Sequence, residues 1–384
     1  MTFRPLRGTW SYPTTVRFGA GRIAELPDAC RAAGIARPLL VTDRGLAGLP
    51  IAQDAMDRLE AAGMGRAVFA EVDPNPTGAN LDAGLAVLRE GGFDGVVAFG
   101  GGSALDLGKA LALMAGQARP VWDFEDVDDW WRRADAAAIL PVVAVPTTAG
   151  TGSEVGRAAI LTNEATREKK IVFHPRMLAA EVICDPALTV DLPPGLTAGT
   201  GLDAFAHCVE AFSSPHFHPM SQGIALEGMR LVVENLPRAF SEGTDLVARA
   251  HMMAAGAMGA VAFQKGLGAI HALSHPIGAV HGTHHGTTNA VCMPAVLDFN
   301  ERAIRDRFDR AAGYLEIDGG YVGFRDFVDR FNAFFGVPER LRGLGVRAPD
   351  LDALTEAALR DPSVGGNPVA MDPENTRALL ERIV

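Results

Sequence analysis

The sequence predicts an α/β domain built on a parallel sheet, followed by an all-helical domain. Short apolar runs rich in β-branched residues alternate with helical segments as far as Asp185, which is the order that a parallel sheet with crossover helices requires. One of these runs passes through three glycines directly into a helix at residues 94–110. From Pro193 onward only helical periodicity is left. We therefore expect an α/β domain over residues 1–188 and a helical domain over residues 189–384.

The elements of the first domain are expected in a regular order. The expected strands span residues 14–18, 38–43, 65–72, 94–100, 139–146 and 181–185, and a hairpin joins residues 158–162 to 169–173. Helices are expected near residues 23–33, 51–62 and 79–90 and after Ser103. Residues 122–131, which are acidic and rich in tryptophan, predict a surface loop. The second domain is expected to hold helices at residues 197–212, 220–236, 245–263 and 290–300, in the histidine-rich segment before residue 290, and in amphipathic stretches up to residue 384.

Composition and charge limit the classes of function. The chain has 384 residues and a net charge of -11, with no cluster of lysine and arginine, which argues against a nucleic-acid or anionic-membrane partner. The segment Met1–Gly8 lacks the apolar core of a signal peptide, and we expect no window apolar enough to cross a bilayer. The cysteines at positions 30, 184, 208 and 292 show no CxxC or zinc-ribbon spacing and are expected to be buried thiols. We expect a cytoplasmic protein whose ligands are small molecules.

The strand that ends at Gly100 carries an indication of nucleotide binding. It continues through Gly101, Gly102 and Ser103 directly into a helix. Bare backbone permits a close approach, and the helix N-terminus offers free N–H groups and a favourable dipole to a pyrophosphate. The spacing is neither GxGxxG nor a Walker loop, and a simple tight turn is the alternative. Asp106 is expected in the first turn of this helix, on the side that faces the ligand.

Other strand ends offer further polar groups. Asp43 closes the apolar run 38–43, where an acid can accept hydrogen bonds from an adenosine ribose. The run Thr-Thr-Ala-Gly-Thr-Gly-Ser-Glu-Val at residues 147–155 follows another buried strand and predicts a second polar wall for phosphate or ribose, with a flexible loop as the alternative. Asn75 lies between two prolines in a rigid loop that by itself indicates only structure.

Five of the ten histidines of the chain lie within residues 266–286. Imidazole is a common ligand of transition metals and a proton carrier near neutral pH, so this density indicates a metal or proton-transfer site. His271 and His275 are four residues apart, and a helix places both on one face. Pro276 is expected to end or kink that helix. The alternative is a set of ordinary core and surface histidines.

Glycines in the same segment are expected to turn the chain back towards the first histidines. They stand at positions 278, 282 and 286, and their conformational freedom would let either His284 or His285 approach the same point.

A second cluster precedes the histidine segment. Asp203 and His207 are four residues apart in a stretch of good helix formers, so they share a helix face. One carboxylate with several imidazoles is a ligand set suited to ferrous iron or zinc. Four protein ligands from two helices and a loop would leave room for a substrate oxygen.

These motifs, in this order and spacing, resemble those of the iron-containing, or group III, alcohol dehydrogenase family. The resemblance rests on Gly-Gly-Gly-Ser at residues 100–103, Pro-Thr-Thr-Ala-Gly-Thr-Gly-Ser-Glu-Val at 146–155, the pair Asp203 and His207, and the histidine segment. It covers nearly the whole chain. It implies a Rossmann-like N-terminal domain and a helical C-terminal domain, the dehydroquinate synthase-like fold, with a cleft for NAD(P) and one divalent metal.

The resemblance also implies roles for individual residues. The metal ligands fall on Asp203, His207, His271 and His285. His275 resembles the family histidine beside the nicotinamide and the substrate, and His281 and His284 match no functional position. The dinucleotide contacts fall on Asp43, Asn75, Gly101, Gly102, Ser103, Thr147, Thr148 and Lys170. Because a carboxylate at position 43 would repel a 2′-phosphate, NAD is expected rather than NADP.

The implied activity is hydride transfer between an alcohol and NAD, with the metal polarising the substrate oxygen and Fe²⁺ favoured over Zn²⁺. Small primary alcohols, diols and hydroxy acids are all possible substrates, and a homodimer or larger homo-oligomer is expected. Same-fold alternatives are a glycerol-dehydrogenase-like zinc enzyme, a metal-independent maleylacetate reductase and, further away, a dehydroquinate-synthase-like lyase. A nucleotide-binding sensor without turnover is the alternative from another class. The complete set of one acid and three histidines argues against both the metal-free reductase and the sensor.

Overall fold

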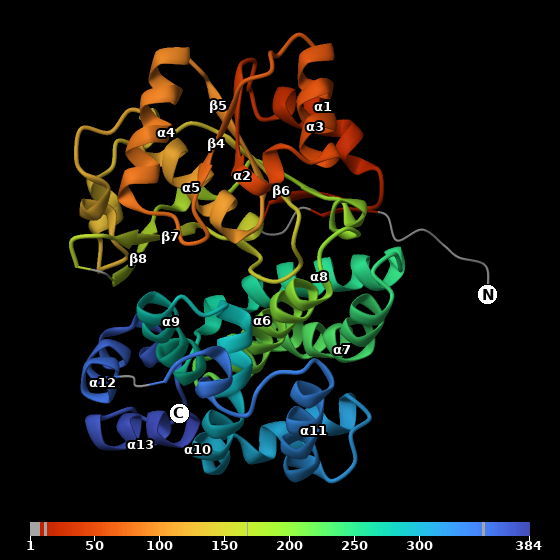
Figure 1. Cartoon of the computed structure of the whole chain (residues 1–384), viewed down its shortest axis with the longest axis vertical. Helices are drawn as coiled ribbons and strands as arrows, with labels where there is room; N and C mark the ends of the chain where they lie inside the picture. Colours follow the sequence, from red (N-terminus) through yellow and green to blue (C-terminus); the bar gives the residue numbers. More distant parts are fainter. Residues whose placement is uncertain (1–7, 11–13, 167, 348–349) are drawn as a thin grey trace. The chain divides into compact units, whose positions relative to one another are not determined.

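The computed structural model describes residues 8–10, 14–166, 168–347 and 350–384 and divides the chain into two compact units (Figure 1). The first unit comprises Met1–Thr148 and Gly152–Asp191. The second comprises Leu192–Val384 together with Ala149–Thr151, so the glycine- and threonine-rich run of residues 147–155 is divided between the two units. No signal peptide was expected in residues 1–8. Residues 1–7 of this segment lie outside the described residues.

The first unit is built on a seven-stranded sheet. In sheet order the strands are β1 (Gly8–Trp10), β2 (Thr15–Phe18), β9 (Glu181–Cys184), β6 (Val142–Pro146), β5 (Gly95–Gly100), β3 (Pro38–Asp43) and β4 (Val68–Val72). Every neighbouring pair is parallel except β1 and β2. The parallel sheet predicted from the sequence is therefore confirmed. The antiparallel edge strand β1 was not predicted, because three residues are too few for a periodicity.

Helices cover both faces of the sheet (Figure 1). Strand β5 is buried along its whole length, and alternate residues face opposite sides. Val97 and Phe99 belong to a core cluster with α1 (Leu26–Ala32) and α3 (Pro50–Ala61). On the other side, a Cβ added at Gly108 of α5 would lie 2.6 Å from the Cβ of Ala98. Only glycine permits this close approach of helix and sheet. On the chain, α4 (Gly78–Gly91) precedes β5, α5 (Gly102–Met114) follows it, and the short α2 (Arg44–Ala47) follows β3.

The predicted hairpin forms a separate two-stranded sheet of β7 (Ala158–Asn163) and β8 (Glu168–Phe173). The segment before β6 agrees in part with the prediction of a surface loop. Residues 126–129 are exposed, but 3₁₀ turns form at Val121–Phe124 and Trp130–Arg133. Phe124 is fully buried, and the N–H of Asp126 donates to the carbonyl of Ile171 on β8 at 2.7 Å. The apolar side chain of Phe124 explains why this part of the segment packs against the protein.

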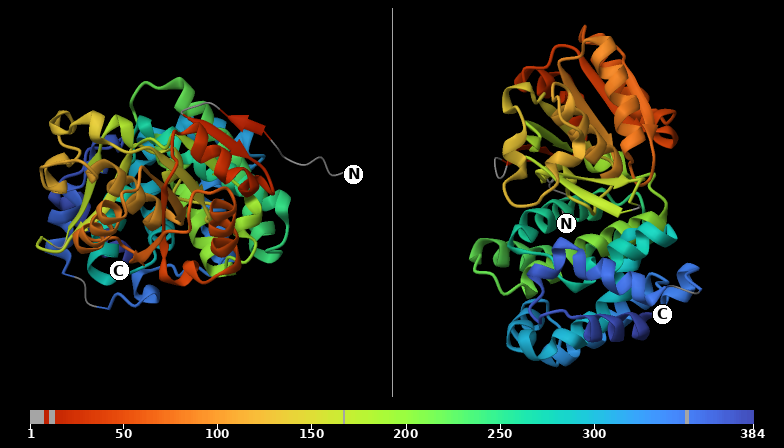
Figure 2. Two further views of the ribbon diagram at one scale, coloured as in Figure 1. Left: turned by 90° about the horizontal axis from the view of Figure 1, so that it is seen from above. Right: turned by 90° about the vertical axis from the view of Figure 1, so that its left-hand side faces the viewer.

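Within the described residues, the second unit contains helices and no strand (Figure 2). They are α6 (Pro194–Ser213), α7 (Pro219–Ser241), α8 (Leu246–Ala262), α9 (Ala269–His281), α10 (His285–Tyr314), α11 (Gly320–Phe334), α12 (Leu351–Arg360) and α13 (Pro373–Ile383), with short 3₁₀ turns between some of them. One stretch, Leu246–Lys265, is long and apolar enough to cross a membrane by length and composition, although none was expected. Of its most apolar window 72% is buried inside the protein, as in the core helix of a soluble domain.

The histidine-rich segment was expected to end its helix or to kink it at Pro276. Helix α9 continues through this proline to His281 instead of ending there. A proline inside a helix loses one backbone hydrogen bond and costs about 3 kcal/mol. The flanking Leu273 and Ile277 are fully buried, and burial of two such side chains is worth a similar amount. Gly282, in the left-handed region at φ 66°, then ends the helix.

Asp185 at the end of β9 holds together the two chain segments that meet there, and it provides a test of the fold. It is fully buried, and its carboxylate accepts hydrogen bonds from the N–H groups of Gly21, Ile23 and Ala187 at 2.9–3.0 Å. Asp185→Ala leaves these donors without their partner, and we expect a destabilisation of about 3 kcal/mol in urea unfolding monitored by circular dichroism. An unfolding midpoint equal to that of the wild type would contradict this role.

Candidate functional site

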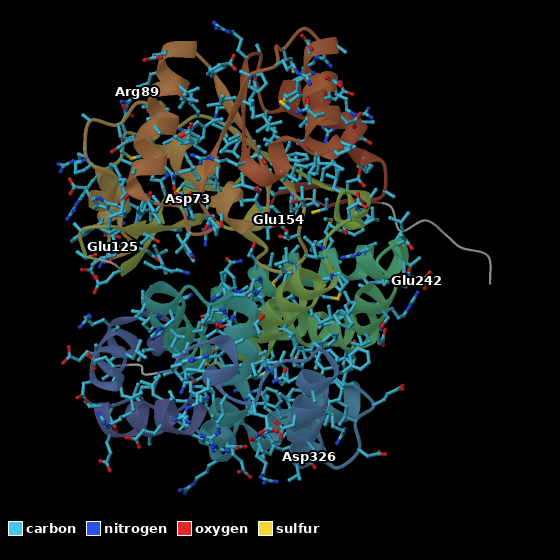
Figure 3. All side chains as sticks on the ribbon, viewed as in Figure 1. Asp73, Arg89, Glu125, Glu154, Glu242 and Asp326 are labelled. Carbon is cyan, nitrogen blue, oxygen red and sulfur yellow. The ribbon has the colours of Figure 1, made fainter. Side chains whose placement is uncertain are left out.

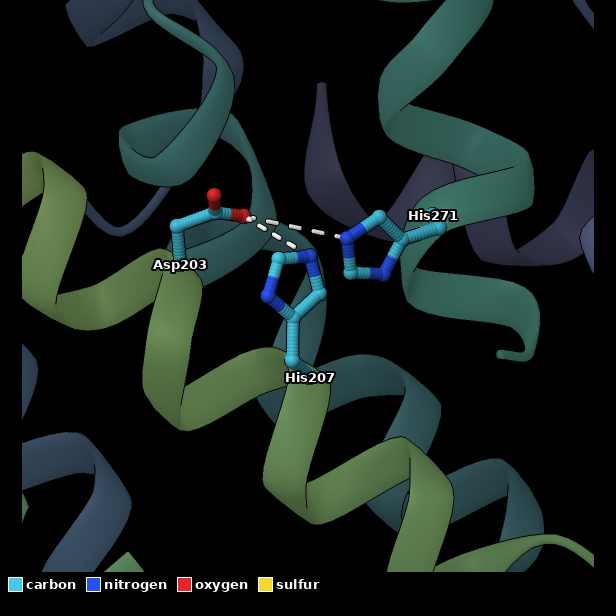
Figure 4. Close-up of side chains that lie close together, drawn as sticks. All are labelled: Asp203, His207 and His271. Carbon is cyan, nitrogen blue, oxygen red and sulfur yellow. Dashed lines mark ion pairs between the residues drawn. The ribbon is translucent and has the colours of Figure 1, made fainter. Parts of the chain in front are cut away.

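The residues of the predicted metal site come together within the second unit. Helix α6 carries Asp203 and His207 one turn apart, α9 carries His271, and His285 is the first residue of α10. Figure 4 shows the first three side chains, with the imidazoles of His207 and His271 turned towards the carboxylate of Asp203. Asp203, His207 and His271 are buried and offer ligand atoms that all lie within 4.8 Å of one another.

Three distances from one oxygen of Asp203 fit the edges of a tetrahedral cation site. The Nε2 atoms of His285, His207 and His271 lie 3.4, 3.6 and 3.7 Å from the same oxygen, Oδ1 of Asp203. Ligand atoms about 2.1 Å from a tetrahedral ion lie about 3.4 Å from one another. The spacing of these donors therefore matches the edges of a metal coordination sphere, and the donor set is one that binds iron or zinc.

Glu210, which no sequence motif singled out, orients one of the histidines. Its Oε2 lies 2.6 Å from Nδ1 of His271, and its Oε1 accepts a hydrogen bond from the N–H of Ile270 at 2.6 Å. Because a carboxylate only accepts hydrogen bonds, Nδ1 of His271 carries the proton and Nε2 faces Asp203. The signal was present in the sequence, since Asp203, His207 and Glu210 repeat with helical spacing along one face of α6.

The pKa values follow from burial and from these two carboxylates. Burial alone would lower the pKa of His271, but Glu210 and Asp203 raise it to about 10. Burial lowers the pKa of His207 to about 4. Burial alone would raise the pKa of Asp203, but the three surrounding histidines hold it well below its ordinary value. Two buried carboxylates against one protonated histidine leave the cluster with a net negative charge, which attracts a cation.

His275 lies beside the cluster and has its own acidic partner. Its ring stacks on that of His285 with 5.3 Å between centroids, and its Nδ1 lies 2.8 Å from Oδ2 of Asp361. Although burial would raise the pKa of Asp361, interaction with His275 lowers it. The pair fixes the proton on Nδ1 and leaves Nε2 as the acceptor. The sequence gives no local signal for this partner, because 86 positions separate the two residues.

The other two histidines of the segment lie apart from this arrangement. His284 precedes α10, and its Nδ1 accepts from the N–H of Thr287 at 3.4 Å as a helix cap. His281 is the last residue of α9. Of the two alternatives that the spacing left open, the structure brings His285 to Asp203 and uses His284 as a cap.

In the first unit, several predicted nucleotide contacts meet at the carboxyl ends of β5 and β6. Gly101 precedes α5, and a Cβ added to it would lie 3.3 Å from Cγ2 of Thr148. The N–H of Thr147 donates to the carbonyl of Gly100 at 2.9 Å. The hydroxyl of Ser103 donates at 2.5 Å to the carbonyl of Pro74, which precedes the exposed Asn75. Gly102 is the first residue of α5.

Two further predicted contacts lie elsewhere in the first unit. Asp43 lies at the carboxyl end of β3, next to β5 in the sheet, and its Oδ1 accepts from the N–H of Leu46 at 2.9 Å. Lys170 lies on β8 and pairs with Glu125, which Figure 3 labels, and with Glu168, at 3.3 and 3.0 Å. Although burial would lower the pKa of Lys170, these carboxylates raise it.

The carboxylate of Asp106 makes hydrogen bonds and an ion pair with other residues of the first unit. It is the fifth residue of α5, not a residue of its first turn. Its Oδ2 accepts from the N–H of Ile160 at 2.9 Å, its Oδ1 accepts from the hydroxyl of Ser153, and the buried amine of Lys109 lies 3.2 Å away. These contacts tie α5 to β7 and leave the carboxylate little capacity for a ligand.

Known proteins share this fold and sequence over nearly the whole chain. The profile of the iron-containing alcohol dehydrogenase family matches residues 13–186, and that of its C-terminal domain matches residues 197–384. The 4-hydroxybutyrate dehydrogenase of Cupriavidus necator is 41% identical, with 97% of this chain and 98% of that protein covered. The 1,3-propanediol dehydrogenase of Klebsiella pneumoniae is 34% identical, with 96% and 97% covered.

Solved structures of similar proteins have the same fold. A 1,3-propanediol oxidoreductase superposes with a TM-score of 0.91 at 33% identity, covering 96% of this chain and 97% of that one. The sulfoacetaldehyde reductase of Bifidobacterium kashiwanohense in complex with NAD⁺ superposes with a TM-score of 0.87 at 28% identity, covering 100% and 99%. As the order and spacing of its motifs predict, the chain belongs to the iron-containing alcohol dehydrogenase family and is an oxidoreductase that acts on the CH–OH group.

Proposed function

We propose that the protein oxidises a small primary alcohol, diol or hydroxy acid, or reduces the corresponding aldehyde, with NAD and one divalent cation. The cation would be held by Asp203, His207, His271 and His285. The convergence of three imidazole Nε2 atoms on one carboxylate oxygen, at 3.4–3.7 Å, carries this proposal. Fe²⁺ is favoured by the family to which the chain belongs, and Zn²⁺ accepts the same donors.

The similar proteins support the substrate class. They include enzymes named for 4-hydroxybutyrate, 1,3-propanediol and methanol. The first and second of these compounds carry a terminal hydroxyl on a short chain with a second polar group at the other end. We therefore propose a short ω-hydroxy acid or diol as the preferred substrate.

Each side chain near the cluster has a separate proposed role in the reaction. A divalent cation at the site would supply Lewis acidity to the substrate oxygen, and NAD would supply the hydride acceptor. Glu210 holds the imidazole of His271 with Nε2 directed at the cluster. Asp361 holds His275 with Nε2 free to accept a proton from a substrate hydroxyl or to pass it to solvent. His275 is therefore the proposed catalytic residue, and Glu210 and Asp361 are positioning residues.

Residues 1–188 are the proposed dinucleotide-binding domain and residues 189–384 the proposed catalytic domain. The division of the chain into two units falls close to this boundary, after Asp191. The glycine-rich start of α5 and Thr147 and Thr148 would bind the pyrophosphate, with Ser103 and Asn75 close by. Lys170 would add a positive charge. We assign Asp106 to positioning α5, because its oxygens are bonded to Ser153 and Ile160.

Asp43→Asn tests the preference for NAD. The amide keeps the cap on α2, since asparagine caps helices as well as aspartate does, but it removes the charge that would repel a 2′-phosphate. We expect the ratio of kcat/KM for NADP to that for NAD to rise roughly tenfold, or about 1.4 kcal/mol, while the unfolding midpoint stays at the wild-type value. An unchanged ratio would place the adenosine ribose away from Asp43.

We also propose a cytoplasmic homo-oligomer. All four cysteines are buried and free, which suits a reducing compartment. The described strand β1 lies at one edge of the sheet, where a second copy can pair with it. Analytical ultracentrifugation of the full chain measures the assembly directly.

Reconstitution with metal tests the proposed function. Protein stripped by a chelator and reloaded with Fe²⁺ or Zn²⁺ is assayed for NADH formation with 4-hydroxybutyrate, 1,3-propanediol and methanol. We expect stripping to abolish turnover, reloading to restore it, and the first two substrates to have the higher kcat/KM. Full activity of stripped protein, or no NAD reduction by any reloaded sample across the panel, would contradict the proposal.

A further inference from the structure

A 3₁₀ turn near the C-terminus, Pro362–Gly366, lies between two residues that bond to helix α9. Asp361 precedes the turn and Asn367 follows it. Each of these two residues stands directly before a proline, which disfavours helical backbone angles at the preceding position. Both are accordingly extended, with φ −69° and ψ 132° at Asp361 and φ −74° and ψ 134° at Asn367. We refer to residues 361–367 as the 361–367 segment.

The two ends of the 361–367 segment bond to α9 at different points. Oδ1 of Asn367 accepts a hydrogen bond from the N–H of Ala269, the first residue of the helix, at 3.2 Å. Oδ2 of Asp361 lies 2.8 Å from Nδ1 of His275 in the second turn. The segment therefore holds α9 both at its start and beside the histidine that is the proposed catalytic residue.

The start of α9 needs Asn367 because the helix has no capping side chain of its own. Gly268 stands at the N-cap position and offers no side chain to the first N–H groups. Side chains from elsewhere replace the cap, since Asn367 accepts from Ala269 and Oε1 of Glu210 accepts from Ile270. A Cβ added at Gly268 would lie 2.9 Å from Oδ1 of Asn367, so a residue with its own cap does not fit beside this oxygen.

Asn300 on α10 fixes the orientation of the Asn367 carboxamide. Its Nδ2 donates to Oδ1 of Asn367 at 2.8 Å, and its Oδ1 accepts from Nδ2 of Asn367 at 2.9 Å. Nδ2 of Asn367 also donates to the carbonyl of Val369 at 2.7 Å. The opposite orientation would turn the amine towards the N–H of Ala269 and the oxygen towards the carbonyl of Val369, so only one orientation satisfies both backbone groups.

We propose that Asn367 is a positioning residue of the reaction, which keeps the 361–367 segment closed on α9 so that Asp361 meets His275. The inference rests on the proposed function, because it takes His275 as the residue that accepts the proton of the substrate. Asn367 contacts neither the substrate proton nor the ring of His275. It acts through the carboxylate at the other end of the same short segment.

The proposed metal ligands do not depend on this contact. Glu210 bonds to the N–H of Ile270 and to Nδ1 of His271, both at 2.6 Å and both independently of Asn367. These bonds keep the second and third residues of α9 against α6. Loss of the Asn367 carboxamide is therefore expected to release the acidic partner of His275 while the ligand cluster stays in place.

A purely structural role is the competing explanation. Asp361 also ends α12, where its N–H donates to the carbonyl of Ala358 at 3.1 Å, so α12 alone could place the carboxylate. In that case Asn367 stabilises the fold without affecting the reaction. The two explanations differ in whether loss of Asn367 acts through Asp361.

A double-mutant cycle between Asn367 and Asp361 tests the proposal, with the full chain reloaded with Fe²⁺ and 1,3-propanediol as the substrate. We expect Asn367→Ala to lower the single-turnover rate of NADH formation roughly 10-fold, as for a misplaced catalytic group, with the KM for NAD and the bound metal at wild-type values. Asp361→Ala should lower the rate roughly 100-fold. The double variant should be no slower than Asp361→Ala, because no contact is left for Asn367 to maintain.

Asn332→Ala is the matched control. Asn332 is a buried amide on α11 that donates to the carbonyl of Ala290 at 2.8 Å, and it lies outside the 361–367 segment. This variant should unfold at a lower urea concentration and keep the wild-type rate. Asn300→Ala replaces Asn367→Ala if the latter does not fold, because it removes only the partner that orients the carboxamide. We expect a smaller decrease, which is again absent when Asp361 is alanine.

The outcomes separate this inference from the proposed function. If the reloaded wild type reduces no NAD, the proposed function is wrong, and if Asp361→Ala reacts at the wild-type rate, the proposed role of His275 with its partner is wrong. If the wild type is active and Asp361→Ala is slow, the proposed function stands. A wild-type rate in Asn367→Ala, an equal fold-decrease with and without Asp361, or an equal decrease in Asn332→Ala would then overturn only the role of Asn367.

Discussion

His271→Ala is expected to lose its metal and at least 1,000-fold in kcat/KM, equivalent to about 4 kcal/mol of transition-state stabilisation. The substitution removes one of four proposed ligands and with it the imidazole that fills the space between Asp203 and Glu210. Glu210, only 4% exposed, keeps the N–H of Ile270 as a partner but loses the bond to Nδ1. Without the imidazole and the cation, the buried carboxylates of Asp203 and Glu210 have no positive charge between them.

Metal content after dialysis, measured by inductively coupled plasma mass spectrometry, and NADH formation provide the two readouts. His281→Ala is the matched control, since His281 stands on the same helix but outside the cluster. It should keep wild-type metal content and turnover. Retention of one equivalent of metal by His271→Ala would show that the cation binds elsewhere, and retention of turnover without metal would point to a metal-free reductase.

The sequence predicts the parts of this site that depend on local spacing. Asp203 and His207 share a face of α6 because four residues make about one helical turn, and the same spacing pairs His271 with His275 on α9. The strand-to-helix turn at Gly101 is likewise local, because glycine and the free N–H groups of the helix start are both read from neighbouring residues. Such features need no knowledge of which helices pack together.

Contacts between segments that are distant along the chain could not be predicted from the sequence. Asp361 meets His275 across 86 positions, and Asn289 meets Asp203 across another 86, with no periodicity to connect them. Pro276 was expected to end or kink α9 because proline disfavours helix interiors. The helix does not end there, because burial on both sides of the proline outweighs that preference. Asp106 was expected to face the ligand, yet its carboxylate bonds to β7 and to Ser153, which lies 47 positions away.

The structure gives Gly286 a role that differs from the expected one, and this role leads to a second prediction. It was expected to let the chain turn back, but it lies inside α10. A Cβ added to it would lie 1.9 Å from the carbonyl oxygen of Gly199 on α6 and 2.9 Å from Cβ of Asp203. Gly286 therefore permits the close crossing of α6 and α10 that brings His285 to Asp203.

Gly286→Ala is expected to destabilise the protein by about 3 kcal/mol or more, because backbone and not a flexible side chain opposes the new methyl group. Relief of the clash requires the two helices to separate by about 1.5 Å, which carries His285 away from Asp203. We therefore expect a lower unfolding midpoint in urea together with weaker binding of metal by chelator competition.

Gly313→Ala provides the comparison on the same helix. Nothing lies within 4 Å of a Cβ added at Gly313, so alanine should stabilise α10 by about 0.5–1 kcal/mol through its higher helix propensity and leave metal affinity unchanged. If both variants were stabilised alike, helix propensity alone would explain them, and the crossing at Gly199 would not determine the distance between His285 and Asp203. Opposite signs would establish that the metal site depends on a glycine contact between two helices as much as on its ligands.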